Sequence, residues 1–102
     1  MKRNDTAKTY GIIGLGPFGR ELLLKLIESG ERVIGCDRRQ DRIDRVKKLT
    51  KTVYVADSYD KSALKEMGYD KCDVVIVCIS QSVDISVLTV MTLLNIGVKR
   101  VI

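Results

Sequence analysis

The chain has 102 residues and contains no histidine, no tryptophan and a single proline, with only 5% aromatic residues. The absence of histidine removes the side chain that most often performs acid–base chemistry near neutral pH and that most often binds zinc. No Tyr-x-x-x-Lys sequence occurs at any of the four tyrosines, so the tyrosine–lysine pair of many dehydrogenases has no candidate. We therefore expect a protein that is not an enzyme and holds no metal.

Cysteine is scarce as well. The three cysteines, Cys36, Cys72 and Cys78, form no C-x-x-C pair, and their odd number does not suggest a disulfide framework. Two of them end apolar stretches, where a free thiol behaves as a small hydrophobic side chain. We expect free thiols in a reducing cytoplasm, while a redox-sensing pair would require a lowered thiol pKa.

Long apolar runs and a strong nucleic-acid signature are also missing. No stretch reaches the roughly 18 apolar residues of a membrane span, and residues 1–8 lack the apolar core of a secretory signal. The net charge of +5 lies largely between residues 38 and 48. Acidic residues interrupt that cluster and no aromatic residue is interleaved with it, which is typical of a solvated helix. We expect a soluble domain without a nucleic-acid partner.

A glycine-rich motif is the most informative feature that the sequence does contain. It follows the apolar run at residues 10–13 and precedes a helical pattern at residues 20–28, and it consists of Gly14, Leu15, Gly16, Pro17, Phe18 and Gly19. G-x-G-x-x-G between a strand and a helix is typical of dinucleotide binding. The first glycine permits a tight turn, the second leaves room for a phosphate, and the third lets helix and strand pack closely. The alternative is a strand–helix turn without a ligand.

An acidic residue follows at the appropriate distance. A second apolar strand at residues 33–36 ends at Asp37, close to the spacing of about 20 residues at which a carboxylate binds ribose hydroxyls. A carboxylate repels a 2′-phosphate, so Asp37 favours NAD(H), ADP or ATP over NADP(H). Arg38 and Arg39 are cations that would suit a 2′-phosphate, although the start of a solvated helix explains both more simply.

Strand and helix patterns alternate along the whole chain. We expect strands at residues 10–13, 33–36, 52–56, 73–79 and 98–102, and helices at residues 17–29, 40–49, 61–67 and 83–96. Right-handed crossovers between neighbouring parallel strands then give an α/β fold, a Rossmann-like doubly wound parallel sheet in the order 3-2-1-4-5. The ligand crevice is expected at the carboxyl ends of strands 1 and 4, where the winding reverses.

The same patterns suggest the domain organisation. We expect residues 1–8 to be a polar tail and residues 9–102 to be one Rossmann-type nucleotide-binding domain. The last strand begins only at residue 98, so we expect this domain to be truncated in or after strand 5.

The last expected helix has an unusual surface. No charged side chain occurs between Asp84 and Lys99. The outer positions of this helix are expected to be Ser86, Thr89 and Asn95, a surface that suits a protein interface better than open water. Coverage by a further segment of the same protein is an equally good explanation.

These features together resemble the RCK family, also called KTN or Trk-N, the nucleotide-binding domain of regulatory subunits of Trk/Ktr-type potassium channels and transporters. The resemblance covers residues 10–102. It rests on the glycine motif at 14–19, Val-Ile-Gly-Cys-Asp at 33–37, Ala-Asp-Ser at 56–58, the short helix at 62–68, Cys-Asp-Val-Val-Ile-Val at 72–77 and the helix at 84–94.

The resemblance implies a cytoplasmic regulatory subunit, peripheral at the inner face of the membrane through its partner. Such a subunit binds an adenine nucleotide (NAD(H), ADP or ATP), assembles as a dimer or ring, and gates a membrane-embedded potassium channel or transporter. The residues expected at the nucleotide are Gly14, Leu15, Gly16, Pro17, Phe18, Gly19, Asp37, Arg38, Asp57, Ser58 and Ser80.

Individual roles follow from the same resemblance. The three glycines would hold the phosphates, Asp37 the ribose, Asp57 the adenine side, and Ser80 the phosphates or the distal group. Many potassium-uptake members carry arginine where this chain has Pro17, which supplies neither a cation nor a backbone N–H. Arg20 would replace that cation only if its side chain turned back, so ATP-specific sensing ranks lower here than in the family.

Two other functions are open at the level of sequence. The chain would also suit the NAD-binding part of a dehydrogenase whose catalytic groups lie in another domain. A stand-alone sensor of nucleotide or redox state, without a membrane pore, would show nearly the same residues. We favour the regulatory function over both.

Overall fold

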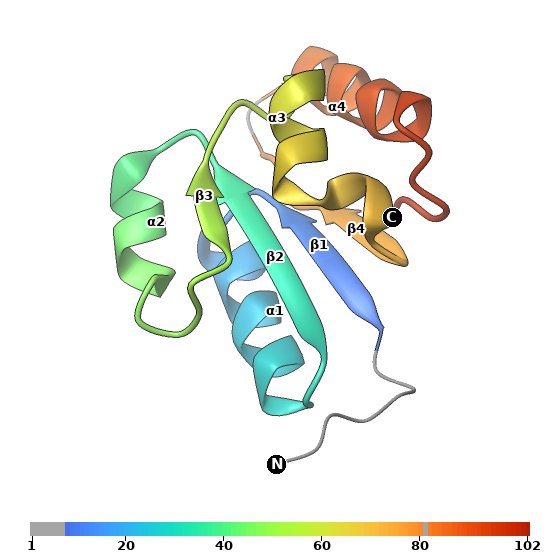
Figure 1. Ribbon diagram of the computed structural model, residues 1–102. Coiled ribbons are helices and arrows are strands. Elements are labelled where there is room, and N and C mark those ends of the chain that lie inside the picture. The colour runs from blue at the N-terminus through green and yellow to red at the C-terminus, as the bar shows by residue number, and fades with distance from the viewer. Residues whose placement is uncertain (1–7, 81) are drawn as a thin grey trace.

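A computed structural model of the chain describes residues 8–80 and 82–102 (Figure 1). Strands and helices alternate as expected. The elements are β1 (Thr9–Ile13), α1 (Pro17–Glu28), β2 (Arg32–Asp37), α2 (Gln40–Val46), β3 (Val53–Val55), α3 (Lys61–Met67), the 3-10 helix η1 (Tyr69–Lys71), β4 (Val74–Val77) and α4 (Val83–Asn95).

The four strands form one parallel sheet in the order β3-β2-β1-β4. Helices cover both faces of this sheet, as Figure 1 shows. On one face, Leu23 of α1 and Ile43 of α2 pack on Ile12, and on the other face Leu64 of α3 and Leu93 of α4 pack with Ile13. Neighbouring residues of β1 thus point into two separate cores, as in a buried parallel strand. The predicted α/β fold and the order of its first four strands are confirmed.

A fifth strand is not formed in the described part of the chain. Val101 makes an isolated parallel bridge to Val75 of β4, and the Ile102 N–H donates to the Val75 carbonyl oxygen at 2.9 Å. The chain end therefore lies on the side of β4 where the fifth strand was predicted (Figure 1). One bridge does not make a strand, so the last position of the order 3-2-1-4-5 is not confirmed.

The 3-10 helix η1 is an element that the sequence patterns did not predict. Its Tyr69 is fully buried and donates its hydroxyl hydrogen to the Ile12 carbonyl oxygen at 2.8 Å. The ring lies directly over Gly11, where an added Cβ would come within 2.8 Å of two ring atoms. Packing between β1 and a turn nearly sixty residues away therefore fixes this helix, and local patterns do not report such contacts.

The prediction of which residues form the outer face of α4 is partly wrong. Thr89 is fully buried, because it lies one turn before the buried Leu93 on the inward side of the helix. Its hydroxyl group hydrogen-bonds with that of Ser58 at 2.6 Å. Ser86 is half-buried, while Asn95 is exposed. The exposed side of α4 is instead apolar and consists of Val83, Val87, Leu88, Met91 and Leu94.

Within residues 8–80 and 82–102, no helix combines the length and the apolar character needed to cross a bilayer. The same residues contain no group of three or more cysteine and acidic side chains placed to bind a metal ion.

Candidate functional site

A pocket opens at the carboxyl edge of the sheet, where the strand order predicted the crevice. The ends of all four strands contribute to its walls, together with one side chain each from α2 and α4. The pocket is lined by Ile13, Gly14, Cys36, Asp37, Arg38, Arg42, Ala56, Asp57, Ser58, Tyr59, Cys78, Ile79, Ser80 and Ile85.

The glycine loop between β1 and α1 contributes Gly14 to the lining of this pocket. Gly14 has a φ of +94°, and a Cβ at this position would lie 2.8 Å from the Cys78 carbonyl oxygen. At Gly19 an added Cβ would overlap the carbonyl oxygen of Gly14. Both positions therefore require glycine: the first for its backbone angle, the second for the close approach of α1 to the strand.

The N-terminus of α1 faces the same edge without a side-chain cap. Gly16 is the N-cap residue and Pro17 is the first residue of the helix. The first helical hydrogen bond runs from the Arg20 N–H to the Gly16 carbonyl oxygen at 2.8 Å. The N–H groups of Phe18 and Gly19 precede this bond and have no partner within the helix, so they can donate to an anion.

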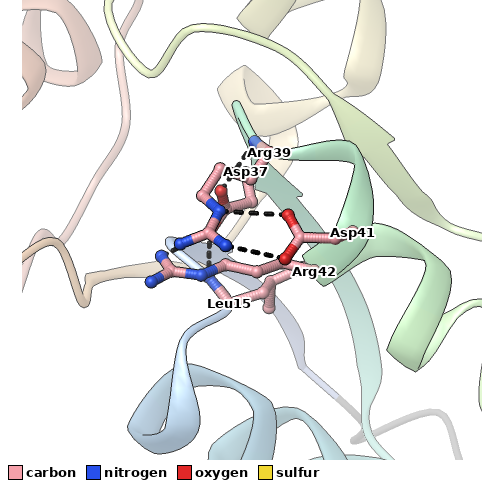
Figure 2. A network of polar contacts seen from close by, with 5 residues as sticks. All are labelled: Leu15, Asp37, Arg39, Asp41 and Arg42. Carbon is pink, nitrogen blue, oxygen red and sulfur yellow. Dashed lines mark hydrogen bonds and ion pairs between the residues drawn. The ribbon is translucent and has the colours of Figure 1, made fainter.

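Asp37 connects this loop to the beginning of α2 (Figure 2). Its carboxylate is buried, with a side-chain exposure of 4%. The Oδ2 atom accepts a hydrogen bond from the Leu15 N–H at 2.8 Å, and the Oδ1 atom accepts one from the Arg39 N–H at 2.9 Å. The Arg42 Nη1 atom lies 3.3 Å from Oδ2. A buried charge is tolerable here because backbone donors and a cation surround it.

The predicted site residues divide into two groups. Those that line the pocket are Gly14, Asp37, Arg38, Asp57, Ser58 and Ser80. The others do not line it: the Leu15 side chain is fully buried in the core beneath α1 and α2, Gly19 is buried as well, and Gly16 is half-buried. Pro17 and Phe18 are exposed at the helix N-terminus, and the Phe18 side chain points into solvent with an exposure of 69%. A role of these residues toward a nucleotide stays a prediction.

Arg42 is the pocket residue that the sequence interpretation missed, because its basic surroundings indicated a solvated helix. Its side chain is only 26% exposed. It lies one turn before the buried Val46, so it is on the inward side of α2. That spacing is the signal that would have identified it. Tyr59, Ile79 and Ile85 also line the pocket, and no motif marked them.

The two remaining arginines at the start of α2 have different surroundings. Arg39 is held by Asp41, with distances of 3.0 Å from Nε to Oδ1 and 2.7 Å from Nη2 to Oδ2 (Figure 2). This hydrogen-bonded partner raises the pKa of Arg39 and lowers the pKa of Asp41, although both side chains are exposed. Arg38 is exposed at the rim of the pocket.

The surroundings of the three cysteines raise their thiol pKa values. Cys36 and Cys78 both line the pocket, and all three cysteines are free. Burial raises the pKa of the Cys36 thiol to about 11 and that of Cys72 to about 12. Burial also raises the pKa of Cys78. A redox sensor would require the opposite shift, so the thiols are best described as part of the core.

The fold and this pocket define the class of the molecule as a Rossmann-type α/β domain with a glycine loop of the dinucleotide-binding kind. Over residues 10–102 the sequence matches the family model of the TrkA-N domain, and the chain belongs to that family. This confirms the resemblance that the motifs indicated.

Two curated relatives agree with the family assignment. The chain is 34% identical over 94 residues to Ktr system potassium uptake protein C of Bacillus subtilis (strain 168), covering 92% of this chain and 42% of that protein. It is 31% identical over 101 residues to Ktr system potassium uptake protein A of Vibrio alginolyticus, covering 99% and 45%. The chain thus spans less than half the length of these relatives.

Solved structures show the same fold at lower sequence identity. The NAD(P)-binding domain of an exopolyphosphatase-related protein from Archaeoglobus fulgidus superposes with a TM-score of 0.79 at 19% identity, covering 92% of this chain and 71% of that one. The TrkA-N domain of the inner membrane protein ybaL from Escherichia coli gives 0.69 at 13% identity, covering 97% and 89%.

Proposed function

We propose that this domain binds an adenine nucleotide, NAD(H), ADP or ATP, and thereby regulates a membrane-embedded potassium channel or transporter. The observation that carries this proposal is the buried Asp37 carboxylate next to the uncapped N-terminus of α1, at the wall of a pocket on the carboxyl edge. A ribose–phosphate unit needs this combination, because its hydroxyl groups donate to a carboxylate while its phosphates accept from backbone N–H groups.

In this proposal the parts of the nucleotide have separate places. The phosphates lie over Gly16 and accept from the N–H groups of Phe18 and Gly19. The ribose lies at Asp37, and the adenine side lies near Asp57 and Ser58, which follow the end of β3. Ser80, beyond the end of β4, is left for the phosphates or the distal group.

Regulation is supported by the family and by the names of the relatives, which are potassium uptake proteins. A nucleotide shifts an equilibrium between two arrangements only if it binds one of them better. We propose that these are arrangements of a homo-oligomer, peripheral at the cytoplasmic face through its membrane partner. The exposed apolar side of α4 supports self-association, since Val83 is 78% exposed and Met91 is 62% exposed.

We do not propose the dehydrogenase alternative. The relatives identified by sequence are potassium uptake proteins, and resemblance to oxidoreductases such as the yeast reductase Gre2, at 16% identity, concerns the fold alone. The domain is therefore proposed to bind its nucleotide without chemical conversion.

The regulatory proposal is tested by potassium uptake in the organism of origin, with the chromosomal copy replaced by variants of the whole protein. Asp37→Ala removes the carboxylate from the pocket, whereas Asp41→Ala removes an exposed carboxylate from the neighbouring helix. We expect changed uptake only for Asp37→Ala, with equal protein levels. Equal uptake by both variants and the wild type would contradict the proposal.

A further inference from the structure

Arg42 contacts the buried carboxylate of the pocket, Asp37. Its Nη1 atom is 3.3 Å from Asp37 Oδ2. The same Nη1 atom and the guanidinium Cζ atom are both 3.6 Å from the place where a Cβ on Gly16 would stand. The guanidinium group thus lies close to both the carboxylate and the glycine loop, and Figure 2 shows it together with Asp37 and Leu15.

This position conflicts with a ribose on Asp37. A carboxylate has about four acceptor positions, two on each oxygen. Leu15 N–H and Arg42 share Oδ2, while Arg39 N–H takes one position of Oδ1. Two ribose hydroxyl groups need one free position on each oxygen. Of the three present donors, only Arg42 is a long side chain that can leave without moving the backbone.

The glycine loop offers the released guanidinium a new partner. The second glycine of the motif is where the backbone approaches a pyrophosphate, and the guanidinium already lies beside Gly16. Arginine binds phosphate oxygens in a bidentate manner. The loop itself supplies no cation, and Pro17 supplies no N–H. Arg39 is held by Asp41, so it does not compete for this place.

We propose that Arg42 is the cation of the diphosphate subsite and exchanges partners on binding. In the empty pocket it pairs with Asp37; when the ribose hydroxyls occupy Asp37, it pairs with the phosphates of the nucleotide. This inference rests on the proposed nucleotide function. It predicts that the affinity depends on the phosphates more than on the nucleoside, because adenosine must break the Asp37–Arg42 pair without offering a new partner.

The test compares ADP, NADH and adenosine in calorimetric titrations of the wild-type chain, Arg42→Gln and Arg45→Gln. Arg45 is an exposed arginine of the same helix, so its variant loses the same charge away from the pocket. We expect Arg42→Gln to bind ADP and NADH at least tenfold more weakly, since a charged hydrogen-bond partner of the phosphates is lost. Adenosine should bind this variant more tightly than the wild type, since it no longer has to break the Asp37–Arg42 pair. Arg45→Gln should stay within about twofold, as is typical of exposed charges.

If the wild-type chain binds the nucleotides, two outcomes would overturn the inference about Arg42 and leave the proposed function standing. In one, Arg42→Gln retains wild-type affinity for ADP; in the other, it loses ADP and adenosine in equal proportion, which would mean that Arg42 only positions Asp37. A wild-type chain that binds none of the three ligands overturns the proposed function together with this inference. If Arg42→Gln does not fold, the ratio of the ADP affinity to the adenosine affinity of the wild type tests the inference instead. A ratio near one would contradict a cation that binds the phosphates.

Discussion

At the scale of single residues, Asp37 has two tasks. Its carboxylate accepts hydrogen bonds from the Leu15 and Arg39 N–H groups and thereby fixes the glycine loop against α2. The same group is the proposed ribose acceptor. A structural and a binding role therefore coincide in one side chain, and substitutions have to be designed so that the two effects can be measured separately.

Asp37→Ala is expected to weaken the binding of an adenine nucleotide by about 1–3 kcal/mol, because the hydroxyl groups of the ribose lose a charged acceptor. Titration calorimetry measures this effect, and thermal unfolding shows how far the loss of the two backbone contacts lowers stability. Asp41→Ala is the matched control, since it removes an exposed carboxylate at the second residue of α2. Unchanged nucleotide affinity in a folded Asp37→Ala variant would show that the Asp37 carboxylate does not bind the nucleotide.

Two glycines allow the fold and the site to be tested independently. A Cβ on Gly11 would lie 2.8 Å from the Tyr69 ring, whereas a Cβ on Gly16 would meet nothing closer than 3.6 Å. We expect Gly11→Ala to lower the free energy of unfolding by about 1–3 kcal/mol through overpacking. For Gly16→Ala the free energy of unfolding should stay within about 0.5 kcal/mol of the wild-type value, while ADP binding should become weaker. Urea unfolding with parallel titrations measures both, and equal stability of the two variants would contradict the packing described for Tyr69.

Residue patterns predicted part of the site and missed part of it for a physical reason. Gly14 directly follows β1, Asp37 is the last residue of β2, and Ser80 lies three residues beyond β4, so the sheet brings all three to the pocket. Arg42 reaches the same pocket from a helix, and its orientation depends on how α2 packs through Ile43 and Val46. The charge cluster around it resembles an exposed face, and the one-turn spacing from Arg42 to Val46 was the sequence signal for its inward side.

At the scale of elements, α4 shows most clearly how residue type can mislead. Hydroxyl side chains in an uncharged helix suggested an outer surface at Thr89, but this residue is buried and bound to Ser58. The exposed positions of this helix carry apolar side chains instead, such as Met91 and Leu94. Substituting Thr89 would therefore test the packing of α4 and not its outer surface.

The exposed side of α4 is tested with Met91→Lys. If this surface mediates self-association, the charge should lower the mass in solution, measured by light scattering, because a lysine would have to be desolvated in the interface. The unfolding midpoint should change little, since Met91 is 62% exposed. Ser62→Lys adds the same charge at an exposed position of α3 and should leave the mass unchanged. An unchanged mass for Met91→Lys would exclude this surface from assembly.

Element boundaries were less predictable than element types. The strand expected at residues 52–56 is only Val53–Val55, because β3 lies at the sheet edge and pairs with β2 through three residues. The helix expected to reach residue 49 ends at Val46, and Leu49 is exposed beyond it. Both differences arise at ends, where tertiary contacts decide how far an element continues.

At the scale of the whole molecule, alternation of strand and helix patterns was sufficient to predict the doubly wound sheet. Handedness of the crossovers and the positions of four strands leave few other arrangements, and the observed order β3-β2-β1-β4 agrees. The fifth position was beyond this reasoning, because a strand requires more pairing than the single bridge from Val101 provides.

The buried thiol and phenol predict a loss of stability at alkaline pH. Burial raises the pKa of Cys36 from 9.0 to about 11, and burial also raises the pKa of Tyr69 well above its ordinary value. Between pH 9 and 11 the unfolded chain has released the Cys36 thiol proton while the folded chain still holds it. The free energy of unfolding therefore falls as the pH rises through this range. The contribution of Cys36 to stability should therefore be complete below pH 9 and fall by about 3 kcal/mol in total as the pH rises past 11.

Urea unfolding between pH 8 and 11.5 measures this loss. In Cys36→Ala the decrease should be smaller, because one ionising group is gone while Tyr69, Cys72 and Cys78 remain. This variant is also less stable at every pH, because of the cavity left behind. The same slope in both proteins would show that Cys36 does not contribute to it.

The central claim is that the pocket at the carboxyl edge holds an adenine nucleotide. It is tested most directly by calorimetric titration of the wild-type chain with NADH, ADP, ATP and NADPH, with its mass in solution determined alongside. The account predicts saturable one-site binding of NADH, ADP or ATP, and weaker binding of NADPH because its 2′-phosphate meets the Asp37 carboxylate. A folded chain that takes up none of these ligands would contradict the claim and leave the glycine loop as a purely structural turn.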